Sequence, residues 1–342
     1  MRTRGRRSSP YATRTPTDSN YWNTTAARLS RWDSASRRDK VNAKPLAILT
    51  VVVMVAQTLL MRAALAHWPV GMVGTFSRVF TIAMLGAWVL GRGRGWRRLK
   101  PRGSGGWLAA MSVNAIVINL LLFTSLKYTT VTNHALLYRL DVVFVILIGI
   151  VLGLERIGWR ELLLLPLMLF GVACVAEIRF TRLEPHVTGD LMVVGGALGF
   201  AINAFILRRI FRAMDTEAVA LINVSATGLG FLGTMLVRNE LTNFGDGLMD
   251  TAAWLWVALF GMTFAIYLTL YYATLGRMPV WKLRMWMLSA PVMVAVADWI
   301  LWDTRLSTQQ RIGMGMVLAG LAGLIHLERN GRFLPRNGNL KE

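Results

Sequence analysis

Apolar runs of about 20 residues alternate with short polar segments from Pro45 to residue 327. A helix needs about 20 mostly apolar residues to cross the hydrocarbon core of a bilayer. By this measure the pattern predicts ten transmembrane helices, near 46–66, 70–90, 106–126, 131–153, 159–176, 188–208, 217–237, 252–274, 281–301 and 312–327. We therefore expect an all-α polytopic membrane protein.

The composition supports this class. Of the 342 residues 54% are hydrophobic and only 16% are charged, whereas about 25% are charged in a soluble globular protein. Residues 1–44 differ from the rest, because they are rich in Arg, Ser and Thr and lack the apolar core of a signal peptide. We expect residues 1–44 to form a disordered, basic cytoplasmic tail and residues 329–342 a cytoplasmic C-terminal tail.

The net charge of +20, from 38 Lys and Arg against 18 Asp and Glu, is also typical of nucleic-acid-binding proteins. Here the basic residues concentrate in alternate polar segments, which are 1–44, 92–102, 156–160, 208–212, 277–284 and 329–342. Cytoplasmic loops carry an excess of Lys and Arg. The charge pattern therefore predicts both termini in the cytoplasm, in an inner or plasma membrane, and no nucleic-acid partner.

The two halves of the chain resemble each other at an offset of roughly 150 residues. For example, "QTLLMR" (57–62) matches "NAFILR" (203–208), and "PLMLFGVACV" (166–175) matches "GMVLAGLAGL" (315–324). We expect one five-helix repeat in residues 45–178 and a second in 188–328. Because five is odd, the second repeat enters the membrane inverted, an arrangement that recurs in secondary transporters. The alternative is a duplication kept only for stability.

Two segments carry a resemblance to a known family. "LGLERIGWRELLLLPLMLFGV" (152–172) and "ILWDTRLSTQQRIGMGMVLAG" (300–320) resemble the acidic turn and helix of EamA-type carriers in the drug/metabolite transporter superfamily. The acidic positions are Glu155 and Asp303. Arg78 and Pro291 also resemble residues of these carriers, whereas Asp141 stands where a proline is more typical. The resemblance implies ten helices in two inverted repeats and the export or exchange of small metabolites.

Two charged residues, Arg139 and Asp141, interrupt the apolar run 136–156. An unpaired charge at the centre of a membrane helix costs about 2.5–3.5 kcal/mol on insertion scales. The two residues are about 200° apart around a helix, so they cannot pair with each other. Asp141 and Arg78 have similar depths, roughly 15 and 13 Å. We predict that these two pair, directly or through substrate or water, and that Asp298 is a partner for Arg139.

The candidate substrate-binding residues are the charged and polar side chains near the midplane, Asp141, Arg78, Tyr138, Gln57, Asn114 and Asn203. The alternative for the charged residues is a structural ion pair, and for Asn203 it is helix packing. Gly315, Ala319 and Gly323 form a small-residue stripe that suits packing in the bundle or a homodimer. Glu155 and Glu161 lie beside basic residues, and we expect a solvated or interfacial charge cluster there.

The architecture predicts a secondary transporter that works by alternating access, and the family resemblance implies that it exports small organic metabolites, such as amino-acid-like compounds or drugs. We expect no catalytic residues, cofactor or metal, because the four histidines lie in separate segments without ligand spacing. No ATP-binding GxxxxGK[ST] loop occurs, so the energy would come from protons or from exchange. The competing classes are a membrane receptor or scaffold that does not transport, and a membrane-embedded enzyme.

Overall fold

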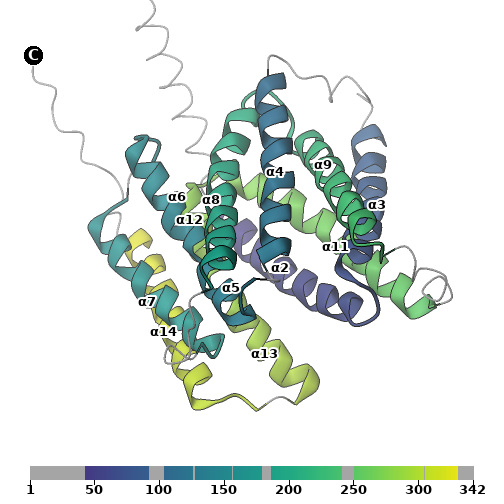
Figure 1. Cartoon of the computed structure of the whole chain (residues 1–342). Helices are drawn as coiled ribbons and strands as arrows, with labels where there is room; N and C mark the ends of the chain where they lie inside the picture. Colours follow the sequence, from purple (N-terminus) through teal and green to yellow (C-terminus); the bar gives the residue numbers. More distant parts are fainter. Residues whose placement is uncertain are drawn as a thin grey trace, which may run out of the picture. The chain divides into compact units, whose positions relative to one another are not determined.

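The computed structural model describes residues 43–91, 104–125, 128–155, 157–178, 186–240, 250–303 and 305–329. Within these ranges the elements are helices and no strand occurs. In chain order (Figure 1) they are α2 (Ala43–Leu65), α3 (Val70–Gly91), α4 (Gly105–Ser125), α5 (Val131–Tyr138), α6 (Leu140–Val151), α7 (Trp159–Val175), α8 (Val187–Ile210), α9 (Thr216–Val237), α11 (Thr251–Leu275), α12 (Val280–Met287), α13 (Ala290–Trp302) and α14 (Thr308–Arg329). The predicted tails lie almost entirely outside the described residues.

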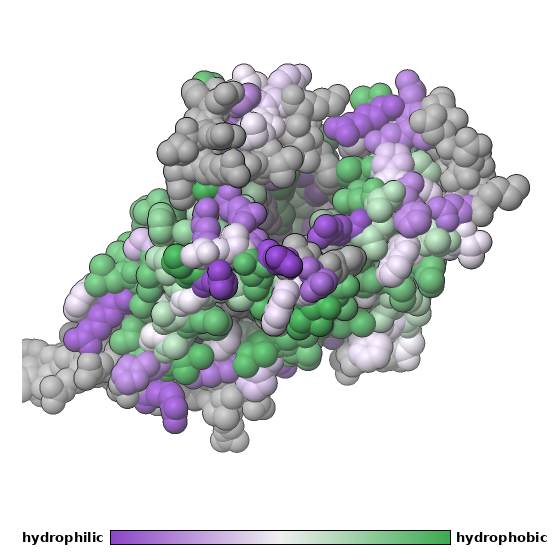
Figure 2. All heavy atoms as spheres, turned by 90° about the horizontal axis from the view of Figure 1, so that it is seen from below, coloured by the Kyte–Doolittle hydropathy of each residue, from purple (hydrophilic) through white to green (hydrophobic). Residues whose placement is uncertain are grey.

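The described part of the chain is a multi-pass membrane protein. Nine of its stretches are long and apolar enough to span a bilayer: Ala43–Leu65, Val70–Gly91, Gly105–Leu122, Asn133–Val151, Val187–Ile210, Thr216–Val237, Thr251–Leu275, Val280–Leu301 and Thr308–Arg329. Large apolar side chains face outward, such as Val237, which is 85% exposed. Figure 2 shows hydrophilic residues gathered near the middle of one face, with hydrophobic residues around them. Such an apolar exterior suits contact with lipid.

Two of the expected helices, 131–153 and 281–301, are each broken into two. The first break lies at Arg139, between α5 and α6, and the second lies at Leu288 and Ser289, between α12 and α13. Pro291 explains the second break, because its ring clashes with the carbonyl four residues earlier, at Met287, where α12 ends. No proline marks the first break, where the Arg139 amide donates to the Leu136 and Leu137 carbonyls in a tight turn.

The helices pack mainly in four pairs: α2 with α11, α4 with α8, α3 with α9, and α7 with α14. The short helix α12 lies inside this packing. All of its residues except Lys282 are buried, and Trp281 is among the largest fully buried side chains. A helix covered on all sides is fixed by its neighbours, and this fixes the position of Arg284 in its last turn.

Helices α7 and α14 approach closely through glycine. A Cβ atom on Gly313 would lie only 2.5 Å from the Gly171 carbonyl oxygen and 2.8 Å from the Val175 nitrogen. Of the small-residue stripe expected at Gly315, Ala319 and Gly323, only Gly323 faces α7. A Cβ on Gly323 would lie 3.1 Å from Leu164, whereas one on Gly315 would meet nothing within 4 Å, and Ala319 is exposed. The buried positions of α14 are instead Gly313, Val317, Gly320 and Leu324. Lipid and protein are both apolar, so residue size alone did not reveal which face is buried.

We expect Gly313→Leu to lower the free energy of unfolding by about 1–3 kcal/mol or more, because the added side chain would collide with the backbone of α7. The measurement is the melting temperature of the purified protein in detergent. Gly315→Leu, on the open face of the same helix, is the matched control and should leave the melting temperature nearly unchanged. Equal losses in both variants would contradict the observed register.

Candidate functional site

A cavity of about 470 Å³ lies among the helices and receives side chains from both sequence halves. This volume falls within the range of small-molecule sites. A neighbouring space of about 460 Å³ shares lining residues with it, among them Gln57, Arg78, Tyr138 and Arg139, so the two spaces adjoin. The polar and charged residues that line the first space are Gln57, Thr58, Arg78, Asn119, Tyr138, Arg139, Asp141, Asn203, Asn223, Thr227, Tyr267, Tyr271, Tyr272 and Arg284.

A buried ion pair joins the two broken helices at this cavity. Arg284 Nη1 lies 3.0 Å from Asp141 Oδ2, and both side chains are less than a tenth exposed. Arg284 Nη2 also donates to the Tyr271 hydroxyl at 3.1 Å. Asp141 is in the first turn of α6 and Arg284 in the last turn of α12, so each charge also complements the dipole of its own helix end.

The direct pair predicted between Asp141 and Arg78 is therefore wrong, although both residues line the cavity. The depth along each helix suggests that Asp141 and Arg78 lie at a similar level in the membrane. Depth alone does not show which side chains of other helices lie beside Asp141. Arg284 was missed because it was counted with the cytoplasmic loop charges. Its flanking residues, Met285 and Trp286, are the available signal that it belongs to a membrane helix.

Arg78 is held by aromatic rings. Its guanidinium carbon lies 3.9 Å from the centre of the Phe264 ring and 5.3 Å from that of Phe231. Cation–π contacts of this kind stabilise a desolvated guanidinium. Its Nε is buried and has no hydrogen-bond partner, while Nη1 reaches Ser77 Oγ at 3.5 Å. Among the described residues, no carboxylate lies within ion-pair distance of Arg78.

Arg139 lies at the break between α5 and α6 and lines both spaces. Its guanidinium carbon is 5.8 Å from the centre of the Tyr138 ring. The partner predicted for it, Asp298, instead accepts from Arg62 Nη1, at 3.2 Å to each carboxylate oxygen. The prediction of an Arg139–Asp298 pair is wrong, because α13 packs against α2, which carries Arg62.

Of the six candidate substrate-binding residues, five line the cavity: Asp141, Arg78, Tyr138, Gln57 and Asn203. Asn203 Oδ1 is buried without a hydrogen-bond partner, so it is available to a donor. Asn114 is not among the lining residues. Its amide donates to the Gly199 carbonyl at 3.0 Å and so joins α4 to α8. The binding role of these residues stays a prediction.

An aromatic wall completes the cavity and was largely missed from the sequence. The Tyr267 and Tyr271 rings stack with centres 5.8 Å apart, and Tyr138 meets Phe200 edge-on at 5.6 Å. Asn223 Nδ2 donates to the Tyr272 hydroxyl at 2.7 Å, while its own Oδ1 is buried without a partner. The signal for Asn223 was a single amide within the apolar run 217–237.

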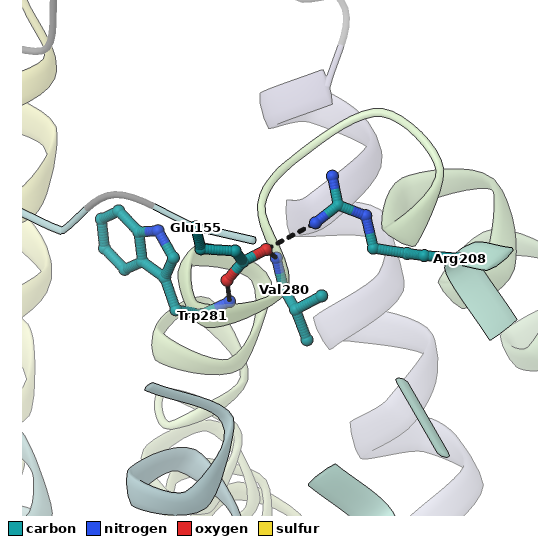
Figure 3. Close-up of polar contacts among 4 residues, drawn as sticks. All are labelled: Glu155, Arg208, Val280 and Trp281. Atoms are coloured by element: carbon teal, nitrogen blue, oxygen red, sulfur yellow. Dashed lines mark hydrogen bonds and ion pairs between the residues drawn. The ribbon is translucent and has the colours of Figure 1, made fainter. Parts of the chain in front are cut away.

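Glu155 caps the other end of α12 (Figure 3). Its carboxylate accepts from the backbone amides of Val280, at 2.6 Å, and Trp281, at 3.1 Å, and it pairs with Arg208 Nη1 at 2.6 Å. Burial raises the pKa of the Glu155 carboxyl, and the two amides and Arg208 oppose that rise. The solvated cluster expected here is wrong for Glu155, because Glu155 is only 8% exposed. Its counterpart in the second half, Asp303, is exposed.

The described residues contain no group of three or more His, Cys, Asp or Glu side chains arranged to hold a metal ion. The chemistry of the cavity is instead that of recognition. It combines one ion pair, two further guanidinium groups, amides with free carbonyl oxygens, and aromatic rings.

Membrane-spanning helices around a polar cavity define a transporter-like class of protein. The model of the EamA-like transporter family matches residues 43–176 and 187–325. The chain belongs to the EamA-like transporter family. It is also 25% identical, over 128 residues, to an uncharacterized transporter of Methanothermobacter thermautotrophicus. That match covers 36% of this chain and 37% of the relative, so the chain spans little more than a third of the relative's length.

A solved crystal structure shares the fold at 17% sequence identity. It has a TM-score of 0.71, and the match covers 85% of this chain and 98% of the other chain. The resemblance to EamA-type carriers seen in the sequence is thus confirmed by the family match.

We expect Asp141→Asn or Arg284→Gln alone to cost about 3–5 kcal/mol of stability, because each leaves a buried charge without its partner. The double variant Asp141→Asn/Arg284→Gln should lose less than the sum of the two. Chemical or thermal unfolding in detergent measures this coupling. The control pair Asp141→Asn/Arg78→Gln should be nearly additive, and a stronger coupling there would contradict the observed pairing.

We expect Glu155→Gln to cost about 1.5–3 kcal/mol, because charge-assisted hydrogen bonds to Arg208 and the α12 amides are weakened. The matched control is Asp303→Asn, which changes the exposed acidic residue at the related position and keeps a residue type that tolerates its positive φ of 50°. Melting temperatures compare the two variants. If Asp303→Asn costs as much as Glu155→Gln, the α12 cap is not the source of the effect.

Proposed function

We propose that this chain is a secondary transporter that moves small organic metabolites across a cell membrane by alternating access, with export as its direction. The observation that carries this proposal is the cavity at the breaks of two membrane helices. Discontinuous helices at a site between two repeats are typical of secondary transporters, because the broken ends offer polar groups to a substrate within the membrane. Asp141 and Arg284 occupy those ends here.

We further propose ten transmembrane helices in two inverted repeats, 45–178 and 188–328. The count takes α5 with α6, and α12 with α13, as one span each and adds the 17-residue α7. The packing pattern supports the repeat. The first and third spans of the first half, α2 and α4, correspond to α8 and α11 of the second half. Exchanging corresponding helices therefore converts the α2–α11 pair into the α8–α4 pair. The same exchange leaves the α3–α9 and α7–α14 pairs unchanged. The fourth span is broken in both halves.

Contacts between helix ends support the inverted arrangement. Glu155 follows the fourth span, Arg208 ends the sixth and Val280 begins the ninth, and a ten-span path places all three on one side. Glu240, after the seventh span, accepts from the Met72 amide at the start of the second. Those two ends fall together on the opposite side. Each contact thus agrees with the proposed path of the chain.

The proposed location is an inner or plasma membrane with both termini in the cytoplasm. The charge asymmetry between alternate loops supports this orientation, and it persists when the buried Arg284 is removed from the cytoplasmic side. Lys44 and Lys282 both pair with Glu328 at 2.6 Å. This cluster ties the first, ninth and tenth spans on the proposed cytoplasmic side. Protons or exchange are the proposed energy source, and the bilayer and a small-molecule substrate are the proposed partners.

The test is release from proteoliposomes loaded with labelled amino acids, organic acids, sugars and polyamines. We expect at least one compound to leave faster than from protein-free vesicles. Asn203→Leu should slow its release at least tenfold, because a bulkier apolar side chain replaces a free carbonyl oxygen in the cavity. Ile202→Leu, on the exposed side of the same helix, is the control. A ligand that binds but is never released faster would instead support the receptor or scaffold alternative.

A further inference from the structure

We infer that the cavity takes a small organic anion with one carboxylate and an apolar, often aromatic, body. This inference rests on the proposed function of the cavity as a substrate site, and it narrows the substrate class. Three features support it: the balance of charges, the free donors of Arg78 and the aromatic walls.

The charge balance of the cavity is positive. Its described lining contains three guanidinium groups, Arg78, Arg139 and Arg284, and a single carboxylate, Asp141. Arg284 neutralises Asp141 at 3.0 Å, so that pair contributes no net charge. Arg78 and Arg139 have no carboxylate within ion-pair distance among the described residues. Arg139 also acts electrostatically on Asp141, but one carboxylate cannot neutralise three guanidinium groups. Uncompensated charges within a membrane are costly, and a bound monoanion would neutralise one of the two excess positive charges.

The guanidinium of Arg78 is prepared to bind a carboxylate. The Phe264 ring lies against it at 3.9 Å and holds it without using its hydrogen-bond donors. Its Nε is buried and unpartnered. A guanidinium presents a planar fork of donors that matches the two oxygens of a carboxylate. The buried, unpartnered donor thus favours an anionic group at Arg78.

The walls of the cavity suit an apolar body. Phe200, Phe264 and Tyr267 line it, and its volume of about 470 Å³ accommodates a ring with a short side chain. A cation would face two unpaired guanidinium groups. The ammonium of a zwitterion would find neutral acceptors in the Asn203 and Asn223 carbonyl oxygens, but the one carboxylate in the described lining is Asp141, which Arg284 already occupies. The arrangement therefore favours a monoanion over a cation or an amino acid.

Three compounds with the same phenyl body test the inference: phenylacetate, phenylalanine and phenethylamine, which are an anion, a zwitterion and a cation. Binding to the purified full-length protein is measured by calorimetry and by the melting temperature. We expect phenylacetate to bind at least tenfold more tightly than the other two. Equal or tighter binding of phenylalanine or phenethylamine would overturn the inference. The absence of phenylacetate binding up to about 10 mM would also overturn it, because that concentration is roughly ten times a weak Kd of about 1 mM.

Arg78→Gln should weaken phenylacetate binding at least tenfold, since it removes the charged fork. Arg62→Gln is the matched control, because Arg62 is mostly exposed and does not line the cavity. Equal binding by Arg78→Gln and wild type would overturn the role of Arg78. If Arg78→Gln does not fold, Arg139→Gln replaces it with the same expected direction, and the three-compound comparison on wild type decides the class alone.

The same compounds in proteoliposomes separate this inference from the proposed function. If phenylacetate binds, but neither it nor any compound of the earlier panel is released faster than from protein-free vesicles, transport is refuted and the anion site stands. Release of phenylalanine or phenethylamine, without binding of phenylacetate, would support transport and overturn the anion site.

Discussion

The ion pair between Asp141 and Arg284 is the constraint on which the centre of this structure depends. A buried ion pair contributes little net stability, because the loss of hydration nearly cancels the attraction, but breaking it is costly. The ion pair therefore acts mainly by specifying which two helix ends pack against each other. Here it requires the first turn of α6 to lie beside the last turn of α12. The ion pair thus joins the two broken spans at the cavity that both residues line.

The same two helices are joined again at their opposite ends. Glu155 follows α6 and accepts from the amides that begin α12, while Asp141 begins α6 and pairs with Arg284 near the end of α12. The two short helices thus run antiparallel, with a carboxylate from the α6 segment at each end. The Asp141–Arg284 contact borders the cavity, and the Glu155 contact lies at the start of the candidate span Val280–Leu301. The two contacts together fix α12 against the α6 segment.

Hydrophobic periodicity predicted the all-helical membrane fold, because apolar length alone identifies a span. It also placed Asp141, Arg78, Tyr138, Gln57 and Asn203, which do line one cavity. The partners were harder to predict, because a linear pattern gives the depth of a charge and not its neighbours on other helices. Pro291 signals one helix break, whereas the break at Arg139 has no such local signal. Arg284 looked like a loop charge because it lies close to Arg277 and Lys282.

The inferred substrate charge bears on the energetics of the proposed export. Each transport cycle returns the protein to its starting state, so the net charge moved is that of the substrate alone. A monoanion that leaves a cell with a negative interior gains about 2.3 kcal/mol per 100 mV of membrane potential. The membrane potential would therefore add to the driving force for release that protons or exchange are proposed to supply. Arg78 and Arg139 favour a bound anion, and the membrane potential favours the outward movement of an anion. The inferred substrate charge therefore agrees with the proposed direction.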